Sequence, residues 1–247
     1  MTTPDPTDGP RSFVDADLRG ARFVRADLSG AVMRAVEVDG ADIDAPWLAD
    51  GSLRVNGVEV AAYVESELCR RFPGRELRAA PDVAGLRRAW SVLEQSWAVL
   101  LDRVAAMPAG TAEVSVDGEW SFAQTLRHLV MATDTWLGRG VLGLERPYHP
   151  IGQPHAEYET DGCDLSVFDT RTPTYDEVLE ARAGRVAMVG DFLADVSAGA
   201  LDAPGRDPWD PDHPVTVRSC LHVILEEEWE HQRYAVRDLD ALAAGTA

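Results

Sequence analysis

Four stretches of the chain repeat apolar residues at the intervals of three and four that place them on one face of a helix. These stretches are residues 82–107, 121–142, 174–196 and 216–242. No apolar run in the chain approaches the roughly 20 residues that cross a bilayer. The pattern predicts a mainly α fold, in which a four-helix bundle buries the four apolar faces in a common core.

Residue types also indicate where two of these helices start and which connections between the helices are long loops. Ser121 and Thr174 are good N-caps, and each is followed three residues later by Gln or Glu, the spacing of a capping box. The connections 143–173 and 198–215 are long and rich in proline, glycine and aspartate. Because long loops in a compact domain often carry function, we expect these two crossover loops to shape a binding pocket.

Residues 11–45 follow a period of five, which fits neither a helix nor a strand. The central residue of every repeat is apolar: Phe13, Leu18, Phe23, Leu28, Met33, Val38 and Ile43. The segment resembles the pentapeptide-repeat family, a right-handed β-helix in which the central residue and a small residue two positions earlier point inward. At the family's spacing the segment makes fewer than two coils, which bury little core alone. A DNA-mimicking role, as in some long members of that family, requires a longer rod.

A connector separates the repeats from the bundle. Residues 52–60 alternate in polarity around Asn56-Gly57, the signal of a tight hairpin turn, and residues 61–72 have the pattern of a short helix. We therefore predict three parts: a pentapeptide-repeat segment over 11–48, a connector with a hairpin and a short helix over 49–79, and the four-helix bundle over 80–247.

The amino-acid composition of the chain limits the kinds of molecule that it is expected to bind. The chain has 42 acidic and 23 basic residues and a net charge of −19, which repels nucleic acid phosphates and anionic lipid. The N-terminus lacks a basic start followed by an apolar stretch, and Cys69, Cys163 and Cys220 form no CxxC pair. The sequence predicts a cytoplasmic protein that binds neither nucleic acid nor membrane and whose acidity serves solubility.

Three of the six histidines lie on predicted helices. His149, His155 and His213 stand near prolines in the long loops, and we interpret them as surface residues. His128 falls beside the apolar stripe of the second helix, so its side chain points toward the bundle interior or its rim. A lone buried histidine is more often a hydrogen-bonded core residue than a metal ligand. His128 is therefore a candidate ligand only if other metal-binding side chains lie near it.

The fourth predicted helix supplies two partners. Glu227 and His231 are four residues apart and share one face, whereas His222 is nine residues from His231 and lies on the opposite face. Two histidines and one carboxylate leave positions open for water or substrate, as in catalytic metal sites, so His128, Glu227 and His231 are our candidate metal ligands. Glu228 stays open as an alternative to Glu227, and a plain salt bridge and core packing are the structural alternatives.

The other side of this helix carries charged residues. We expect the face with Glu226, Glu230, Arg233 and Arg237 to be solvated, with an ion pair between Glu230 and Arg233. Cys220 lies two turns from Glu227, about 10 Å along the axis, which is too far to join the same metal shell.

These residues and the helix layout resemble the DinB/YfiT superfamily, whose mycothiol-dependent branch includes maleylpyruvate isomerase. The resemblance covers residues 80–247 and is carried by His128-Leu129 with a following aromatic residue and by the pattern Glu227-x-Trp229-x-His231. It implies a divalent metal, usually zinc, held by His128, Glu227 and His231. Many other members carry histidine where Glu227 stands. The isomerase has a further C-terminal domain with substrate contacts that this chain lacks, so isomerase activity is not implied.

The resemblance also implies a function. It points to mycothiol or a similar thiol as cosubstrate, and a Zn²⁺ site with an open position deprotonates a bound thiol. We expect a divalent-metal-dependent transferase that joins a low-molecular-weight thiol to a small electrophilic substrate, with Trp136, Trp209 and Tyr234 as pocket walls. A metal-dependent hydrolase or self-resistance enzyme with Glu228 as its base, and a non-enzymatic metal-binding interaction module, are the alternatives. Dimers are common in the family, so a homodimer is a further expectation.

Overall fold

The computed structural model describes residues 12–156, 158–159, 163–210 and 212–245. Arg11, where the predicted repeats begin, and the last two residues of the predicted bundle lie outside these residues. The chain divides into two compact units, one ending at Asp44 and one from Ala45 to Ala247. Within the described part of the chain, no helix is both long and apolar enough to cross a membrane.

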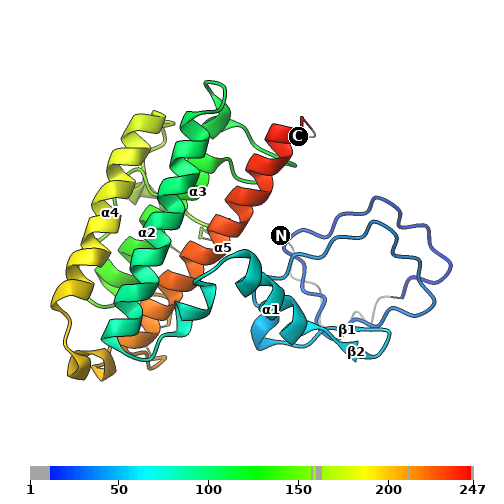
Figure 1. Cartoon of the computed structure of the whole chain (residues 1–247), viewed down its shortest axis with the longest axis horizontal. Coiled ribbons are helices and arrows are strands. Elements are labelled where there is room, and N and C mark those ends of the chain that lie inside the picture. Colours follow the sequence, from blue (N-terminus) through cyan, green and yellow to red (C-terminus); the bar gives the residue numbers. More distant parts are fainter. Residues whose placement is uncertain (1–11, 157, 160–162, 211, 246–247) are drawn as a thin grey trace. The chain divides into compact units, whose positions relative to one another are not determined.

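The second unit contains the predicted four-helix bundle (Figure 1). Its helices are α2 (Val83–Ala105), α3 (Phe122–Thr133), α4 (Tyr175–Asp195) and α5 (Val217–Ala244). Both α2 and α3 pack against α4 and α5, so α2 and α3 occupy one diagonal of the bundle and α4 and α5 the other. The predicted mainly α class is confirmed.

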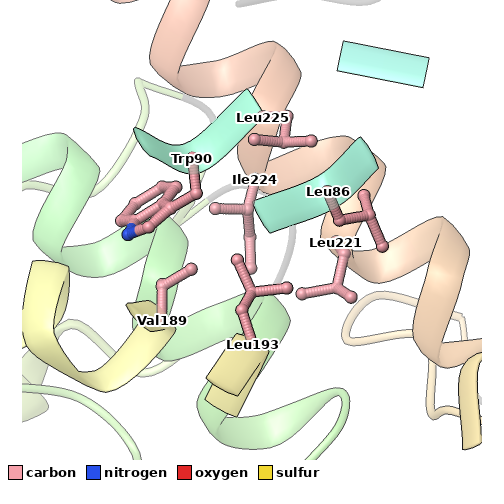
Figure 2. A pocket seen from close by; sticks show the side chains of 7 residues that line it. All are labelled: Leu86, Trp90, Val189, Leu193, Leu221, Ile224 and Leu225. Carbon is pink, nitrogen blue, oxygen red and sulfur yellow. The ribbon is translucent and has the colours of Figure 1, made fainter. Parts of the chain in front are cut away.

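The centre of the bundle is densely packed. Figure 2 shows the seven side chains that surround a gap of about 10 Å³ in this core: Leu86, Trp90, Val189, Leu193, Leu221, Ile224 and Leu225. A gap of this size corresponds to about one water molecule, and an apolar lining gives that water no hydrogen-bond partner. Around this gap, burial and dispersion between apolar side chains hold α2, α4 and α5 together.

Helix α3 ends earlier than the periodicity predicts and continues as a π-helix from Asp134 to Arg139. Its start agrees with the prediction, because the Ser121 side chain closes a capping box with Gln124. The buried Asp134 carboxylate in the π-helix accepts hydrogen bonds from Arg185 of α4 (2.6 Å) and from the backbone N–H of His149 (2.8 Å). This one carboxylate ties the start of the 143–173 loop to both α3 and α4.

The connector has the predicted hairpin and helix. Strands β1 (Arg54–Val55) and β2 (Val58–Glu59) pair antiparallel, and both residues of the turn, Asn56 and Gly57, have the positive φ that a type I′ turn requires. Helix α1 follows. Its bounds are Ala61–Arg71. The described residues also form short 3₁₀ turns at Leu48–Asp50, Arg75–Ala79, Thr111–Glu113, Leu165–Val167 and Ala198–Asp202.

The solvated face predicted for α5 is wrong, because the 3₁₀ turn η2 (Arg75–Ala79) covers it. The Arg75 guanidinium lies 2.8 Å from the Glu230 carboxylate, and Arg78 bonds Glu226 at 2.6 Å. Glu230 is consequently buried. The predicted ion pair between Glu230 and Arg233 is present at 2.8 Å. Sequence periodicity could not show that two arginines of the connector neutralise this face.

The first unit repeats its backbone geometry every five residues. A positive φ recurs at Asp15, Gly20, Arg25, Gly30, Ala35 and Gly40, so each repeat contributes one sharp corner. At Gly20 the turn closes with a hydrogen bond from the Ala21 N–H to the Leu18 carbonyl, and glycine adopts this φ without steric cost.

The expected burial of the central repeat residues is not found. Their side chains, Phe13 to Ile43, are 46 to 65% exposed. The physical reason is length, since fewer than two coils give a residue a stacked neighbour on one side at most.

One buried ion pair joins α4 to α5. Arg182 Nη2 donates to the Glu228 carboxylate at 2.6 Å, and the two side chains are only 6% and 1% exposed. Burial raises the pKa of Glu228, although Arg182 opposes this effect. Such a pair costs desolvation when it forms, but removing one partner leaves the other charge buried alone.

We expect Arg182→Met to lower the free energy of unfolding by about 3–5 kcal/mol, because Glu228 then loses its partner. The double variant Arg182→Met/Glu228→Met should recover most of this loss. Arg70→Met, which breaks an exposed pair with Glu67, should leave stability nearly unchanged. Chemical denaturation followed by circular dichroism measures all three, and equal losses for the two single variants would contradict the prediction.

Candidate metal centre

Three side chains from two helices converge between α3 and α5. His128 comes from α3, and Glu227 and His231 come from α5; one ligand atom of each lies within 4.8 Å of the other two. His128 Nε2 is 3.3 Å from Glu227 Oε2. The two imidazole rings stack with centroids 4.6 Å apart. The structure therefore brings together the three residues that the sequence singled out as metal ligands.

Backbone carbonyls fix the orientation of both rings. His128 Nδ1 lies 3.1 Å from the Gln153 carbonyl oxygen, and His231 Nδ1 lies 2.9 Å from the Glu227 carbonyl oxygen. A carbonyl only accepts, so each Nδ1 carries the proton and donates, which leaves each Nε2 with a lone pair. This use of the second ring nitrogen is how proteins orient metal-binding histidines.

The donor set fits a cation. In this tautomer the His128 Nε2 lone pair faces the Glu227 carboxylate oxygen across 3.3 Å, and two acceptors so close require a positive charge between or upon them. Burial acts to raise the pKa of Glu227, but the close contact with His128 and the electrostatic effect of the two imidazoles outweigh it, so that pKa is lowered. Two imidazoles and one carboxylate suit a divalent ion such as Zn²⁺.

Burial is also the main cause of the lowered pKa of His231, which is about 4, and His128 lowers it further. Its ring is therefore neutral over the physiological range. A neutral imidazole is the form that binds a metal ion, so His231 does not need to lose a proton first.

Aromatic rings flank the two histidines. The Trp120 ring lies 4.8 Å from the His128 ring and stacks on His231 at 6.2 Å, while Tyr234 meets His231 edge-on at 5.8 Å. Trp120 was missed by the sequence analysis, because it lies in a loop outside any periodic segment. Its position directly before the N-cap Ser121 is the signal that could have placed it near the first turns of α3.

The three predicted pocket residues are placed differently. Tyr234 contacts His231 directly. Trp209 is half-exposed and meets the His155 ring edge-on at 5.4 Å, where the two long loops come together. Trp136 packs against the hydrophobic core, and no ring contact between it and either histidine occurs among the described residues.

Several other expectations are corrected or supported. Glu228 cannot substitute for Glu227 because it is paired with Arg182. His149 and His155 are partly buried rather than on the surface, whereas His213 is exposed. His222 is structural, as expected, since its Nε2 lies 2.9 Å from the Ala80 carbonyl oxygen. Cys220 is not in the group of candidate ligand atoms found among the described residues, as its distance along the helix predicts.

We expect the His231 ring of the metal-free protein to titrate with a midpoint near 4 rather than near the ordinary value of about 6.5. Because the unfolded chain binds this proton more readily, the stability it contributes is complete above pH 6.5 and is lost as the pH falls to 4. Imidazole resonances followed by NMR, assigned with His231→Gln, measure the midpoint. A midpoint at 6 or above would contradict the described burial.

Comparison with known proteins identifies the families that the two parts of the chain match. Residues 92–235 match the DinB superfamily, and residues 12–44 match eight copies of the pentapeptide repeat. No curated protein and no solved structure matches the chain. The first match spans more than half of the chain and includes all three candidate ligands, and on this evidence the chain belongs to the DinB superfamily.

Proposed function

We propose that the protein is a divalent-metal-dependent transferase that joins a low-molecular-weight thiol, of the mycothiol kind, to a small electrophilic substrate. The observation that carries the proposal is the convergence of His128, Glu227 and His231 on one point. Three protein ligands leave a coordination position for a substrate, which is the arrangement of catalytic rather than structural zinc sites. The chemistry that bound zinc supplies is deprotonation of a thiol at neutral pH.

The chain's own residues hold this arrangement ready. The Gln153 and Glu227 carbonyls fix the two rings, and the lowered pKa of Glu227 keeps the carboxylate charged. Trp120 lies beside both rings, and apolar neighbours strengthen electrostatic interactions within a site because they lower its polarity. His155 and Trp209 contact each other where the two long loops meet, and their rings are suited to contact an apolar electrophile.

One observation favours the transferase over the metal-dependent hydrolase or self-resistance enzyme. A hydrolase requires a general base beside the attacking water, and Glu228 was the candidate. That carboxylate is buried against Arg182 and does not belong to the group of ligand atoms. A thiol that ionises on binding needs no such base. A non-enzymatic metal-binding module requires neither an open position nor aromatic side chains beside it.

We expect protein purified without a metal-affinity tag to contain about one zinc or similar ion per chain. His231→Ala and Glu227→Gln should each lose it, because two ligands hold a divalent ion far more weakly than three. Elemental analysis measures the content. His213→Ala is the matched control, since His213 is exposed and bonds Asp207 rather than the site.

Absence of metal from the wild type after incubation with Zn²⁺, Ni²⁺ or Mn²⁺ would refute the site. A second readout does not depend on activity. Because Trp120 lies close to both rings, Co²⁺ should quench the tryptophan fluorescence of the wild type. Trp120→Phe should remove most of that quenching although six tryptophans remain of the seven.

Mycothiol should raise the melting temperature of the zinc-loaded wild type. A ligand that binds only the folded state adds about 2.7 kcal/mol of stability at 100 times its dissociation constant. The zinc-free protein and His231→Ala should show no shift. If zinc binds but neither mycothiol nor another small thiol changes the melting temperature, the metal site stands and the thiol reaction does not.

A further inference from the structure

A second cavity, separate from the metal centre, opens between α2 and α4. Its volume is about 570 Å³, which is within the range of small-molecule sites. At its mouth lie Glu94 and Ala98 of α2 and Ala183 and Ala187 of α4, all of them exposed. Three of these four side chains are methyl groups, which leave the entrance open to solvent.

The walls of the cavity are apolar and partly aromatic. Trp90, Leu93 and Trp97 of α2 face Leu179 and Val186 of α4 across it. Trp90 also borders the small core gap (Figure 2), so one side of its ring packs in the core and another lines the cavity. Such walls bury an aromatic or polycyclic molecule favourably.

The deep end of the cavity is polar. Arg182 and Glu228 form part of its lining, and Arg182 is 5% exposed. Arg182 Nη2 is taken by Glu228, but Nη1 is buried and has no hydrogen-bond partner among the residues that the structure describes. An unsatisfied buried donor costs free energy that a ligand acceptor recovers.

The charges select an uncharged ligand. Arg182 and Glu228 neutralise each other, and Glu94 adds a negative charge at the mouth. An anion would be repelled there and would find no net positive charge inside. A cation would meet the donor Nη1 rather than an acceptor. A carbonyl or similar neutral acceptor satisfies Nη1 and adds no buried charge.

The cavity and the candidate metal centre lie on different faces of α3 and α5. On α3, Leu126 lines the cavity while His128 belongs to the metal centre, and two residues on a helix differ by about 200°. On α5, Glu228 lines the cavity and Glu227 belongs to the metal centre. The two sites therefore share helices but no ligand residues.

We propose that the cavity between α2 and α4 is a second binding site, which takes an uncharged, largely apolar molecule with a carbonyl-type acceptor that reaches Arg182. This site goes beyond the proposed transferase activity and does not depend on it.

The test uses prodan, an uncharged naphthyl ketone whose emission shifts to the blue in apolar surroundings, with the full-length protein. We expect saturable, blue-shifted binding at one site per chain. Ala187→Phe places a large ring at the mouth and should weaken binding at least tenfold. Ala194→Phe is the matched control, because Ala194 is exposed on the same helix, two turns further along and outside the cavity lining, and it should bind as the wild type does.

A second arm tests the acceptor. The prodan analogue with a propyl chain in place of the propionyl group should bind about tenfold more weakly, the change expected for losing a hydrogen bond to a charged donor. Equal affinity of the two probes would overturn the role of Arg182. Circular dichroism and ultracentrifugation of each variant check that folding and oligomeric state are unchanged.

Two results would overturn the site itself. In the first, the wild type shows no saturable binding of prodan. In the second, Ala187→Phe binds prodan as tightly as the wild type does, and loss of binding by His231→Ala would then assign the probe to the metal centre. Dissociation of a dimer by Ala187→Phe, with no binding of prodan to the wild type, would instead make this face a contact between two copies of the chain.

Discussion

The rotation of about 100° per residue along α5 governs the arrangement of charge in this domain. It turns three consecutive glutamates toward three different neighbours. Glu226 meets Arg78 of the connector, Glu227 meets His128 of α3, and Glu228 meets Arg182 of α4. A single turn of one helix thus anchors the connector, supplies one residue of the candidate metal centre and locks α4 to α5. Displacing α5 by one residue would disrupt all three contacts together.

This arrangement also isolates the charge that matters for chemistry. Arginine guanidiniums compensate Glu226 and Glu228, so among the three glutamates only Glu227 faces histidines instead of an arginine. The negative charge left at Glu227 is what would attract a cation to the candidate site. The strongly acidic composition of the chain would otherwise offer many competing carboxylates, and ion pairing on either side distinguishes this one from its neighbours.

The sequence could predict what depends on spacing along one helix and not what depends on packing between segments. The four helices, the capping boxes of α3 and α4 and the shared face of Glu227 and His231 follow directly from period and residue type. The burial of Glu230 does not, because it depends on Arg75 of the connector, 155 positions earlier. The choice between Glu227 and Glu228 was open for the same reason, since only the position of Arg182 decides it. Trp120 lies in a loop, where no period exists to reveal which way its ring points.

The hydrogen bond from His128 to the Gln153 carbonyl has a consequence for the long loop after the π-helix. Gln153 is held in place by its own N–H, which bonds the Arg127 carbonyl, and by the bond from Arg127 to the Ile151 carbonyl. One candidate ligand of the metal centre is therefore oriented by a loop rather than by its own helix. Any molecule that stabilises this conformation of the loop would then strengthen the binding of an ion at the candidate site, and by thermodynamic reciprocity the ion would stabilise the loop to the same degree. The order of the loop and the affinity for the ion would therefore be coupled, so that a change in one changes the other.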